Sequence, residues 1–261
     1  MKIHLITFAD GAKSIIEAGN RLIMQATNTN WFDTINLWNL EKIKIADPYW
    51  FNQHNGFILN NPRGFGYWIW KSKIIELTLK NSDENDLIVY IDSGCEININ
   101  GENTFKRYAS IAFKESIFCF YLNGPNYTSE QWTKKHLINR LNKIFFISEY
   151  NPPQIEATFL IVKNVYTVNS FITEWQNLSV ENNYIYSNDL RLENESTDFI
   201  EHRHDQAILS LLLHSKNYGC TIRNENYFPD LWNMNFHPFY APIAAFRNLS
   251  GVERIKSINL I

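Results

Sequence analysis

The chain has 261 residues, of which 45% are apolar and 20% are charged, and its formal net charge is −3. This apolar fraction and this small charge exclude an intrinsically disordered chain. The slightly acidic balance argues against a nucleic-acid-binding protein, which usually shows a concentrated basic excess. The unusual feature is an aromatic content of 15%, from 8 Trp, 13 Tyr and 18 Phe. These rings predict either a ring-rich core or a site that stacks on bases or on sugar faces.

Apolar periodicity predicts strands that alternate with helices along the chain. In chain order we expect a strand at 2–8, a helix at 13–26, a strand at 32–40, a loop at 47–62, a helix at 68–79, a strand at 86–91, a helix at 102–113, a strand at 116–122, a helix at 129–141, a strand at 156–162, helices at 168–178 and 204–214, and mainly loop from 224 onward. No repeat or linker divides the sequence. We therefore expect one domain, residues 1–261, with an α/β fold in which helices flank a central, mostly parallel, Rossmann-like sheet.

The cysteines and the N-terminus bear on where the protein resides. Cys95, Cys119 and Cys220 are widely spaced and form no CxxC pair, which indicates reduced thiols rather than a zinc ribbon or a disulfide framework. The first residues lack the long apolar region and the cleavage site of a signal peptide, and no window approaches about 18 consecutive apolar residues. We therefore expect a cytoplasmic protein without a transmembrane segment.

A polar turn, Asp92-Ser93-Gly94, directly follows the most apolar strand. Ligands of parallel sheets bind beyond the carboxyl ends of the strands. A carboxylate there is costly unless a cation, hydrogen bonds or solvent satisfies it, and a hard cation that bridges to substrate phosphates suits one or two carboxylates. The turn therefore predicts a ligand site, with the alternative that Asp92 only caps the next turn.

The segment from Asn61 to Lys71 combines two cations, Arg63 and Lys71, with a glycine pair and an aromatic cluster before a helix. Its spacing fits neither a P-loop nor a GxGxxG fingerprint. Helix N-termini favour anions, and arginine binds phosphate bidentately. The segment therefore predicts an anion site, unless Trp68 and Trp70 are core residues and the two cations are solvated.

Two later places could also contact a ligand. Asp205 and Gln206 open an apolar helix and could present a carboxylate and an amide, or they could simply complement the helix dipole. The neighbouring His202 and His204 do not form a zinc-protease pattern. His237 lies among aromatic residues and could reach a ligand from the C-terminal part of the chain, or it could be structural.

The order of the motifs ITFADG, GYWIWK, DLIVYIDSGCE, QIEA and HRHDQ resembles that of bacterial GT-A-type glycosyltransferases. The resemblance spans residues 3–237 and is greatest to the nucleotide-diphospho-sugar transferases of capsule or lipopolysaccharide synthesis, with a distant likeness to the glycogenin group. It implies a GT-A-like αβα sandwich. It also implies a nucleotide-binding half at 1–100 and an acceptor-side half at 101–261.

The resemblance implies roles for individual residues as well. It places Thr7, Phe8 and Ala9 against the base and ribose, and it places the catalytic pair Asp205 and Gln206 beside the donor sugar and acceptor. It implies that a divalent cation, Mn²⁺ or Mg²⁺, is bound by Asp92 and His237. The residues that it implies for binding the nucleotide or its diphosphate are Arg21, Lys71, Asp92, Ser93 and Gly94. The second acidic position of the family's Asp-x-Asp motif is Gly94 in this sequence. Glu96 could substitute for it two residues later.

The expected function is therefore hexosyl transfer from a nucleoside-diphosphate sugar, with UDP and retention of configuration favoured, to a glycan or lipid-linked acceptor in surface polysaccharide synthesis. Nucleic acid is not expected as a partner, and peripheral membrane contact stays open. Two alternatives are a glycoside hydrolase that uses Asp92, Glu96 and Asp205, and a non-catalytic carbohydrate-binding protein. Most rings are expected in the core, and the late aromatic cluster is expected to form an acceptor-facing wall (Tyr227, Phe228, Trp232, Phe236, Phe239 and Tyr240).

Overall fold

The structure is a computed structural model that describes residues 1–122, 124–145, 151–216, 219–223 and 240–254. Its strands are β1 (Ile3–Phe8), β2 (Thr34–Trp38), β3 (Leu87–Ile91), β4 (Glu96–Ile97), β5 (Ile117–Tyr121), β6 (Ile155–Lys163), β7 (Cys220–Arg223) and β8 (Ile243–Ala244). Its helices are α1 (Lys13–Thr29), α2 (Leu40–Ala46), α3 (Pro48–Asn60), α4 (Gly64–Tyr67), α5 (Trp70–Lys80), α6 (Glu102–Glu115), α7 (Ser129–Trp132), α8 (Lys135–Phe145), α9 (Tyr166–Tyr184) and α10 (His204–Lys216), with a 3-10 turn at Ile99–Gly101.

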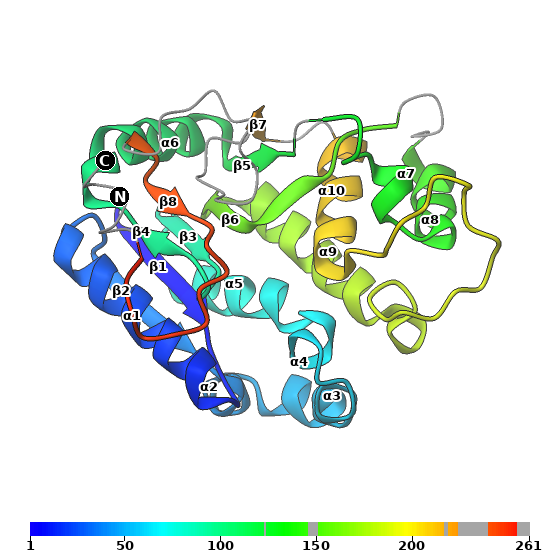
Figure 1. The fold of residues 1–261 in the computed structure, drawn as a ribbon, viewed down its shortest axis with the longest axis horizontal. Helices are drawn as coiled ribbons and strands as arrows, with labels where there is room; N and C mark the ends of the chain where they lie inside the picture. The colour runs from blue at the N-terminus through cyan, green and yellow to red at the C-terminus, as the bar shows by residue number, and fades with distance from the viewer. Residues whose placement is uncertain (123, 146–150, 217–218, 224–239, 255–261) are drawn as a thin grey trace.

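Six of the strands form one sheet in the order β2-β1-β3-β6-β5-β7, and β4 pairs with β8 in a small second sheet (Figure 1). In the large sheet β1 is parallel to β2 and β3, β5 is parallel to β7, and β6 runs antiparallel to both of its neighbours. Five strands thus point the same way and one opposes them. The predicted α/β fold with a mostly parallel central sheet is confirmed.

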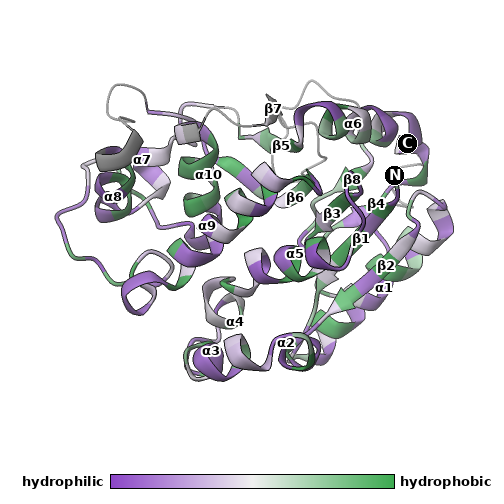
Figure 2. Cartoon of the chain, turned by 180° about the vertical axis from the view of Figure 1, so that it is seen from behind, coloured by the Kyte–Doolittle hydropathy of each residue, from purple (hydrophilic) through white to green (hydrophobic). Residues whose placement is uncertain are grey.

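Helices cover both faces of the large sheet (Figure 1). On one face, Val89 of β3 belongs to a buried cluster with Leu22 of α1 and Tyr108 of α6. On the other face, Tyr90 belongs to a cluster that includes Ile74 of α5 and Trp175 of α9. Successive residues of a strand point to opposite faces, so the continuously apolar β3 is buried on both sides. Figure 2 shows the same layering by hydropathy, with hydrophobic residues concentrated on the strands and on the sheet-facing sides of the helices.

The expectation of a loop at 47–62 is wrong, because α3 occupies most of that segment. The Asp47 side chain caps it by accepting a hydrogen bond from the Trp50 amide at 2.9 Å, and Pro48 stands in the first turn, where its missing N–H leaves no bond unmade. The helix buries Trp50, His54 and Ile58, one residue in each turn. Such a narrow stripe gives a weak periodic signal.

Two other expectations differ in detail. The helix expected at 129–141 is divided into α7 and α8, because Thr133 between them has extended backbone. The C-terminal loop expected from residue 224 onward lies mostly outside the described residues, and its described part contains the short strand β8. None of the described helices has the combination of length and apolar character that crossing a membrane requires.

Two features shape the carboxyl end of β3. The pairing of β5 with β6 shifts register between Cys119 and Tyr121, so that β6 carries a bulge. In this stretch the Thr158 carbonyl of β6 accepts a hydrogen bond from the Asp92 amide at 2.9 Å. In addition, the segment 240–254 crosses the turn after β3, where the Asn248 amide donates to the Gly94 carbonyl at 2.8 Å. Bulges often re-aim side chains beside functional sites, and this one lies beside Asp92.

Candidate functional site

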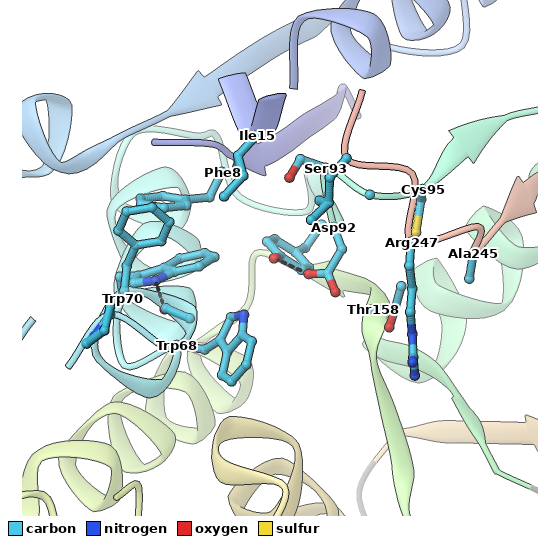
Figure 3. A pocket seen from close by; sticks show the side chains of 16 residues that line it. Phe8, Ile15, Trp68, Trp70, Asp92, Ser93, Cys95, Thr158, Ala245 and Arg247 are labelled. Atoms are coloured by element: carbon cyan, nitrogen blue, oxygen red, sulfur yellow. Dashed lines mark hydrogen bonds between the residues drawn. The ribbon is translucent and has the colours of Figure 1, made fainter. Parts of the chain in front are cut away.

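A pocket of about 450 Å³ opens beyond the carboxyl ends of β1 and β3 (Figure 3). This is the edge of the sheet at which ligands bind in such folds. One wall is aromatic, the floor is the turn after β3, and the opposite wall is the segment 240–254. The lining residues include Phe8, Phe65, Trp68, Trp70, Asp92, Ser93, Gly94, Thr158 and Arg247.

The aromatic wall is built on an uncommon piece of backbone. All five residues from Gly64 to Trp68 have positive φ, between 52° and 81°. The Tyr67 amide bonds to the Arg63 carbonyl at 2.9 Å and the Trp68 amide bonds to the Gly64 carbonyl at 3.0 Å, so the segment is one turn of left-handed helix. A left-handed conformation costs roughly 1–2 kcal/mol for each residue that is not glycine. Strain of this kind persists where the surroundings impose it, often at ligand sites.

Packing around this left-handed turn holds it in place. The Trp70 indole Nε1 donates to the Gly64 carbonyl at 2.9 Å, and the Trp70 ring stacks on Phe8 with centroids 3.7 Å apart. Phe65 meets Phe8 edge to face at 5.7 Å. Phe8 and Trp70 are buried, whereas Phe65 and Trp68 are partly exposed and line the pocket. The turn therefore offers two rings to a ligand and uses the buried pair as support.

The floor of the pocket carries one open carboxylate, that of Asp92 (Figure 3). Its Oδ1 accepts a hydrogen bond from the Tyr90 hydroxyl and lies 3.4 Å from the Lys71 ammonium. Burial, followed by the nearby Asp92 charge, raises the pKa of Tyr90 well above its usual value, so this hydroxyl stays a donor. The Oδ2 atom of Asp92 has no partner among the described residues. Tyr90 and Lys71 thus orient the Asp92 carboxylate through Oδ1, and Oδ2 is available to a ligand in the pocket.

Lys71 and Asp205 lie behind this floor and do not line the pocket. The Lys71 side chain is only 3% exposed, and its Nζ lies 2.7 Å from Asp205 Oδ2. Burial alone lowers the pKa of Lys71, but the carboxylates of Asp205 and Asp92 outweigh it, and the pKa is raised. Burial raises the pKa of Asp205, and Lys71 opposes that rise. The sequence motifs GYWIWK, YIDSG and HRHDQ therefore meet in one charged cluster.

Arg21 is buried on the far side of the same turn. Its guanidinium donates to the carbonyls of Cys95 at 2.8 Å, Asn248 at 2.9 Å and Ser93 at 3.0 Å, and also to that of Ser250. These bonds join the turn after β3 to the C-terminal segment. The expected contact of Arg21 with a nucleotide stays a prediction.

Only some of the other residues expected to contact the nucleotide line the pocket. Phe8, Ser93 and Gly94 line the pocket, whereas Thr7 and Ala9 are buried and do not line it. A Cβ at Gly94 would lie 3.3 Å from the Arg247 Cα, so the lack of a side chain lets the C-terminal segment cross closely. Their roles, too, stay predictions.

Of the expected catalytic pair, neither residue lines the pocket. Asp205 is held by Lys71 as described, and the Gln206 amide donates to Gln154 Oε1 at 3.3 Å. Gln154 of the QIEA motif is itself buried and also contacts Ser129, Thr133 and Ser210. HRHDQ and QIEA therefore contact each other directly, in a layer beneath the pocket.

A divalent cation is the cofactor that the resemblance implies. Among the residues that the structure describes, no group of three His, Cys, Asp or Glu side chains could hold a metal ion. The Glu96 carboxylate is turned to Asn248 Nδ2 at 2.6 Å and to the Arg254 amide at 2.8 Å, so it does not complete an Asp-x-Asp pair. His237 lies outside the described residues. One open carboxylate, that of Asp92, fits a cation that is held largely by its substrate, as Mg²⁺ often is, and it does not fit a cation held by these residues alone.

Sequence reasoning did not identify Arg247 as a site residue. It is exposed, has φ of +50° and stands on the wall opposite the aromatic rings (Figure 3). Arg247 forms no ion pair with another described residue, so its guanidinium is available to an anion. No periodic pattern surrounds it in the sequence, and only the crossing of the C-terminal segment over Gly94 brings it to the pocket.

No family model and no curated protein matches this sequence. Among solved structures, a glycosyltransferase involved in the glycosylation of the major capsid of PBCV-1 aligns over 100% of both chains at 10% identity, with a TM-score of 0.49. Mouse xyloside xylosyltransferase 1 in its apo form aligns over 97% of this chain and 100% of its own at 8% identity, with a TM-score of 0.48. The apo-form glycosyltransferase GlyE of Streptococcus pneumoniae aligns over 97% of this chain and 55% of its own at 13% identity, with a TM-score of 0.43. TM-scores below 0.5 at such identities assign neither a family nor an activity to this chain.

Proposed function

We propose that the protein is a glycosyltransferase that moves a hexose from a nucleoside-diphosphate sugar, with a UDP-sugar favoured, to a glycan or lipid-linked acceptor. The observation that carries the proposal is the pocket at the carboxyl ends of β1 and β3. It brings an open carboxylate, Asp92, and an available guanidinium, Arg247, to a wall of partly exposed rings. These are the groups that a ligand with a diphosphate, a sugar and a base requires.

Each group has a task in such a transfer. Negative charge develops on the leaving diphosphate, and Arg247 can pair bidentately with its oxygens. Asp92 would help to hold a divalent cation, which would neutralise part of that charge. Phe65 and Trp68 supply flat apolar surface for a base or a sugar face. The Thr158 hydroxyl, on the floor beside Asp92, can hydrogen bond to a sugar hydroxyl.

The arrangement of carboxylates supports transfer over the hydrolase alternative. A glycoside hydrolase needs two carboxyl groups that face one cleft, about 5–10 Å apart. Within the described part of the chain, Asp92 is the one carboxylate that lines the pocket, and the carboxylates of Glu96 and Asp205 are engaged elsewhere. The carbohydrate-binding alternative does not account for an open Asp92 opposite an available Arg247.

The finer parts of the proposal concern the outcome and the setting of the reaction. We extend it to retention of the anomeric configuration, to surface polysaccharide synthesis and to action in the cytoplasm. These parts rest on the sequence resemblance. Analysis of the anomeric configuration of the first-formed product tests retention directly.

Calorimetric titration with UDP and GDP, with and without Mn²⁺, tests the proposal, together with hydrolysis assays on a panel of UDP-sugars. We expect binding of UDP and slow hydrolysis of at least one donor. Asp92→Ala should remove the gain in UDP affinity that Mn²⁺ provides. Failure of the protein to bind any nucleoside diphosphate would refute the proposal, and sugar binding that survives Asp92→Ala without any nucleotide binding would favour the carbohydrate-binding alternative.

A further inference from the structure

The charged cluster behind the pocket contains three side chains from three elements. Asp92 follows β3, Lys71 lies in the first turn of α5 and Asp205 lies in the first turn of α10. Asp92 faces the pocket, whereas Lys71 is 3% exposed and Asp205 is 6% exposed. Lys71 stands between the two carboxylates, at 2.7 Å from Asp205 and 3.4 Å from Asp92. The buried pair therefore reaches the pocket through its neighbours, chiefly through Asp92.

The ammonium of Lys71 is enclosed by acceptors of the protein itself. A lysine ammonium has three N–H donors and no acceptor. In this structure three acceptors surround it, namely the two carboxylates and the Ala157 carbonyl at 3.1 Å. Ala157 belongs to the bulged part of β6, so the bulge supplies one of the three. A donor diphosphate would have to displace one of these partners to reach the ammonium.

The three charges also depend on one another. Two neighbouring carboxylates disfavour each other's charged form, and a cation between them relieves this repulsion. If Lys71 were neutral, the Asp205 carboxylate would act on Asp92 across a poorly solvated space. If Asp205 were neutral, Lys71 would be free to turn fully toward Asp92. The orientation of the open carboxylate thus depends on both buried partners.

Other titratable groups also lie near Asp92, and Glu156 and Arg21 are close enough to act on the neighbouring Cys95 thiol. The Tyr90 hydroxyl of β3 bonds to Asp92 Oδ1, Arg247 stands across the pocket, and Cys95 lies in the same turn. Burial, with Asp92 next in importance, raises the pKa of the Cys95 thiol well above its usual value, so it adds no charge to the cluster. Tyr90 and Lys71 both act on Asp92 Oδ1, so together they hold that oxygen and leave Oδ2 to the pocket.

We propose that Lys71 and Asp205 are positioning residues, which set the orientation of the Asp92 carboxylate toward the donor and do not themselves contact the diphosphate. The proposal rests on the proposed function and assigns to Lys71 and Asp205 a role different from the direct contacts that the sequence resemblance implies. A misplacement of about 1 Å at a reacting group can reduce turnover by about 100-fold. Loss of either partner should therefore reduce turnover much more than nucleotide affinity.

The test compares Lys71→Met, Asp205→Asn and the double variant with the wild-type protein. Two quantities are measured, namely the dissociation constant of UDP by calorimetry in EDTA and the turnover of the UDP-sugar that the wild-type protein hydrolyses. Lys73→Met is the matched control, because Lys73 is another lysine of α5, is 4% exposed and forms ion pairs with Asp47 and Glu76 away from the pocket. Thermal unfolding shows which variants fold.

We expect Lys71→Met to lower turnover by about 100-fold while the UDP dissociation constant changes by less than about 3-fold. The double variant should recover at least about 5-fold of that loss, because removal of both charges leaves Asp92 with its Tyr90 hydrogen bond and without an unbalanced neighbour. If Lys71→Met does not fold, Asp205→Asn carries the test, with the same split between turnover and affinity.

Three results would overturn the proposal. A UDP dissociation constant weakened by more than about 10-fold in Lys71→Met, with no recovery in the double variant, would make the ammonium a direct phosphate ligand. Turnover in Lys71→Met equal to that in Lys73→Met would make the pair merely structural. Absence of UDP binding and donor hydrolysis in the wild-type protein would refute the proposed function itself, and the positioning role with it.

Discussion

Lys71 and Lys134 are both buried, yet their surroundings differ in kind. Lys71 meets two carboxylates and one carbonyl. Lys134 meets only neutral oxygens of one loop, the carbonyls of Ile185 at 2.6 Å, Asn188 at 2.5 Å and Leu190 at 3.2 Å, with the Asn188 side-chain oxygen at 3.2 Å. The pKa of Lys71 is raised, whereas burial lowers the pKa of Lys134 to about 8.

Three histidines also hold the loop around Lys134. His136, His202 and His204 also bond to its carbonyls, at 3.0, 2.8 and 2.6 Å respectively. Burial lowers the pKa of His202 well below its usual value and that of His204 to about 4, so both are neutral donors at pH 7. Lys134 bonds to the carbonyls of a single loop, so we infer that its role is structural. Lys71 pairs with carboxylates from two separate elements beside the pocket, so we infer that its role concerns the site.

The largest expected effect is at the open carboxylate. Asp92→Asn keeps the size of the side chain but removes its charge, and it should lower donor turnover by about 1,000-fold, as expected when a preorganised charge is lost from a transition state. Single-turnover kinetics with the active UDP-sugar measures this. Asp83→Asn, at an exposed carboxylate remote from the pocket, is the control. Turnover equal to the control would remove Asp92 from the reaction.

Lys134→Met should affect stability and not activity. It leaves the carbonyls of the 185–190 loop without their donor, and the free energy of unfolding should fall by about 3 kcal/mol, as for buried acceptors that lose their partner. Guanidinium unfolding measures the loss, with the neighbouring exposed Lys135→Met as control. A change within about 0.5 kcal/mol, the range of ordinary surface substitutions, would contradict this structural role.

The pH dependence of stability separates the two lysines further. Lys134 releases its proton near pH 8 in the folded protein and near 10.5 when unfolded. Between these values the unfolded chain holds more protons, so stability rises with pH in this window. The unfolding free energy of wild type should therefore rise relative to Lys134→Met by about 2 kcal/mol between pH 7 and pH 10. Denaturant titrations at both pH values measure this, and a constant or falling difference would be inconsistent with it.

The smallest expected effect is on the left-handed turn that precedes Lys71. Gly66 has φ of +81°, and a Cβ there would lie 2.9 Å from Ile58 Cγ1. Gly66→Ala should therefore reduce the free energy of unfolding by about 1 kcal/mol or slightly more. Gly56→Ala is the matched control, because Gly56 lies in α3 with nothing within 4 Å of the added atom, and alanine there should be neutral or stabilising. Equal stability of the two variants would mean that the turn is not strained.

Local patterns predict the sheet and the position of Asp92 well. The apolar run of β3 needs burial on both faces, and the first carboxylate after it must lie at the binding edge of the sheet. The helix α3 escapes prediction because its buried stripe is one residue wide. The left-handed turn escapes because Phe65, Tyr67 and Trp68 have no intrinsic preference for positive φ, and only tertiary packing imposes it.

The candidate site depends still more on long-range contacts. Sequence motifs place Lys71, Asp92 and Asp205 in the site, but the ion pairs that join them form only through the packing of α5, β3 and α10. The C-terminal segment brings Arg247 to the pocket, and its Asn248 and Arg254 bind the Glu96 carboxylate away from the pocket. The sequence of this segment has no periodic signal that would predict its path. Tyr240 is the one member of the late aromatic cluster within the described residues, and it is exposed. The expected aromatic wall around it stays a prediction.

A crystal structure of the protein with UDP tests the central claim most directly. We predict the diphosphate in the pocket, within hydrogen-bonding distance of the Arg247 guanidinium and facing Asp92, with Lys71 still bound to Asp205 and the Ala157 carbonyl. A diphosphate bound directly to the Lys71 ammonium would contradict the positioning role. UDP bound at any other surface of the protein would contradict the assignment of this pocket as the donor site.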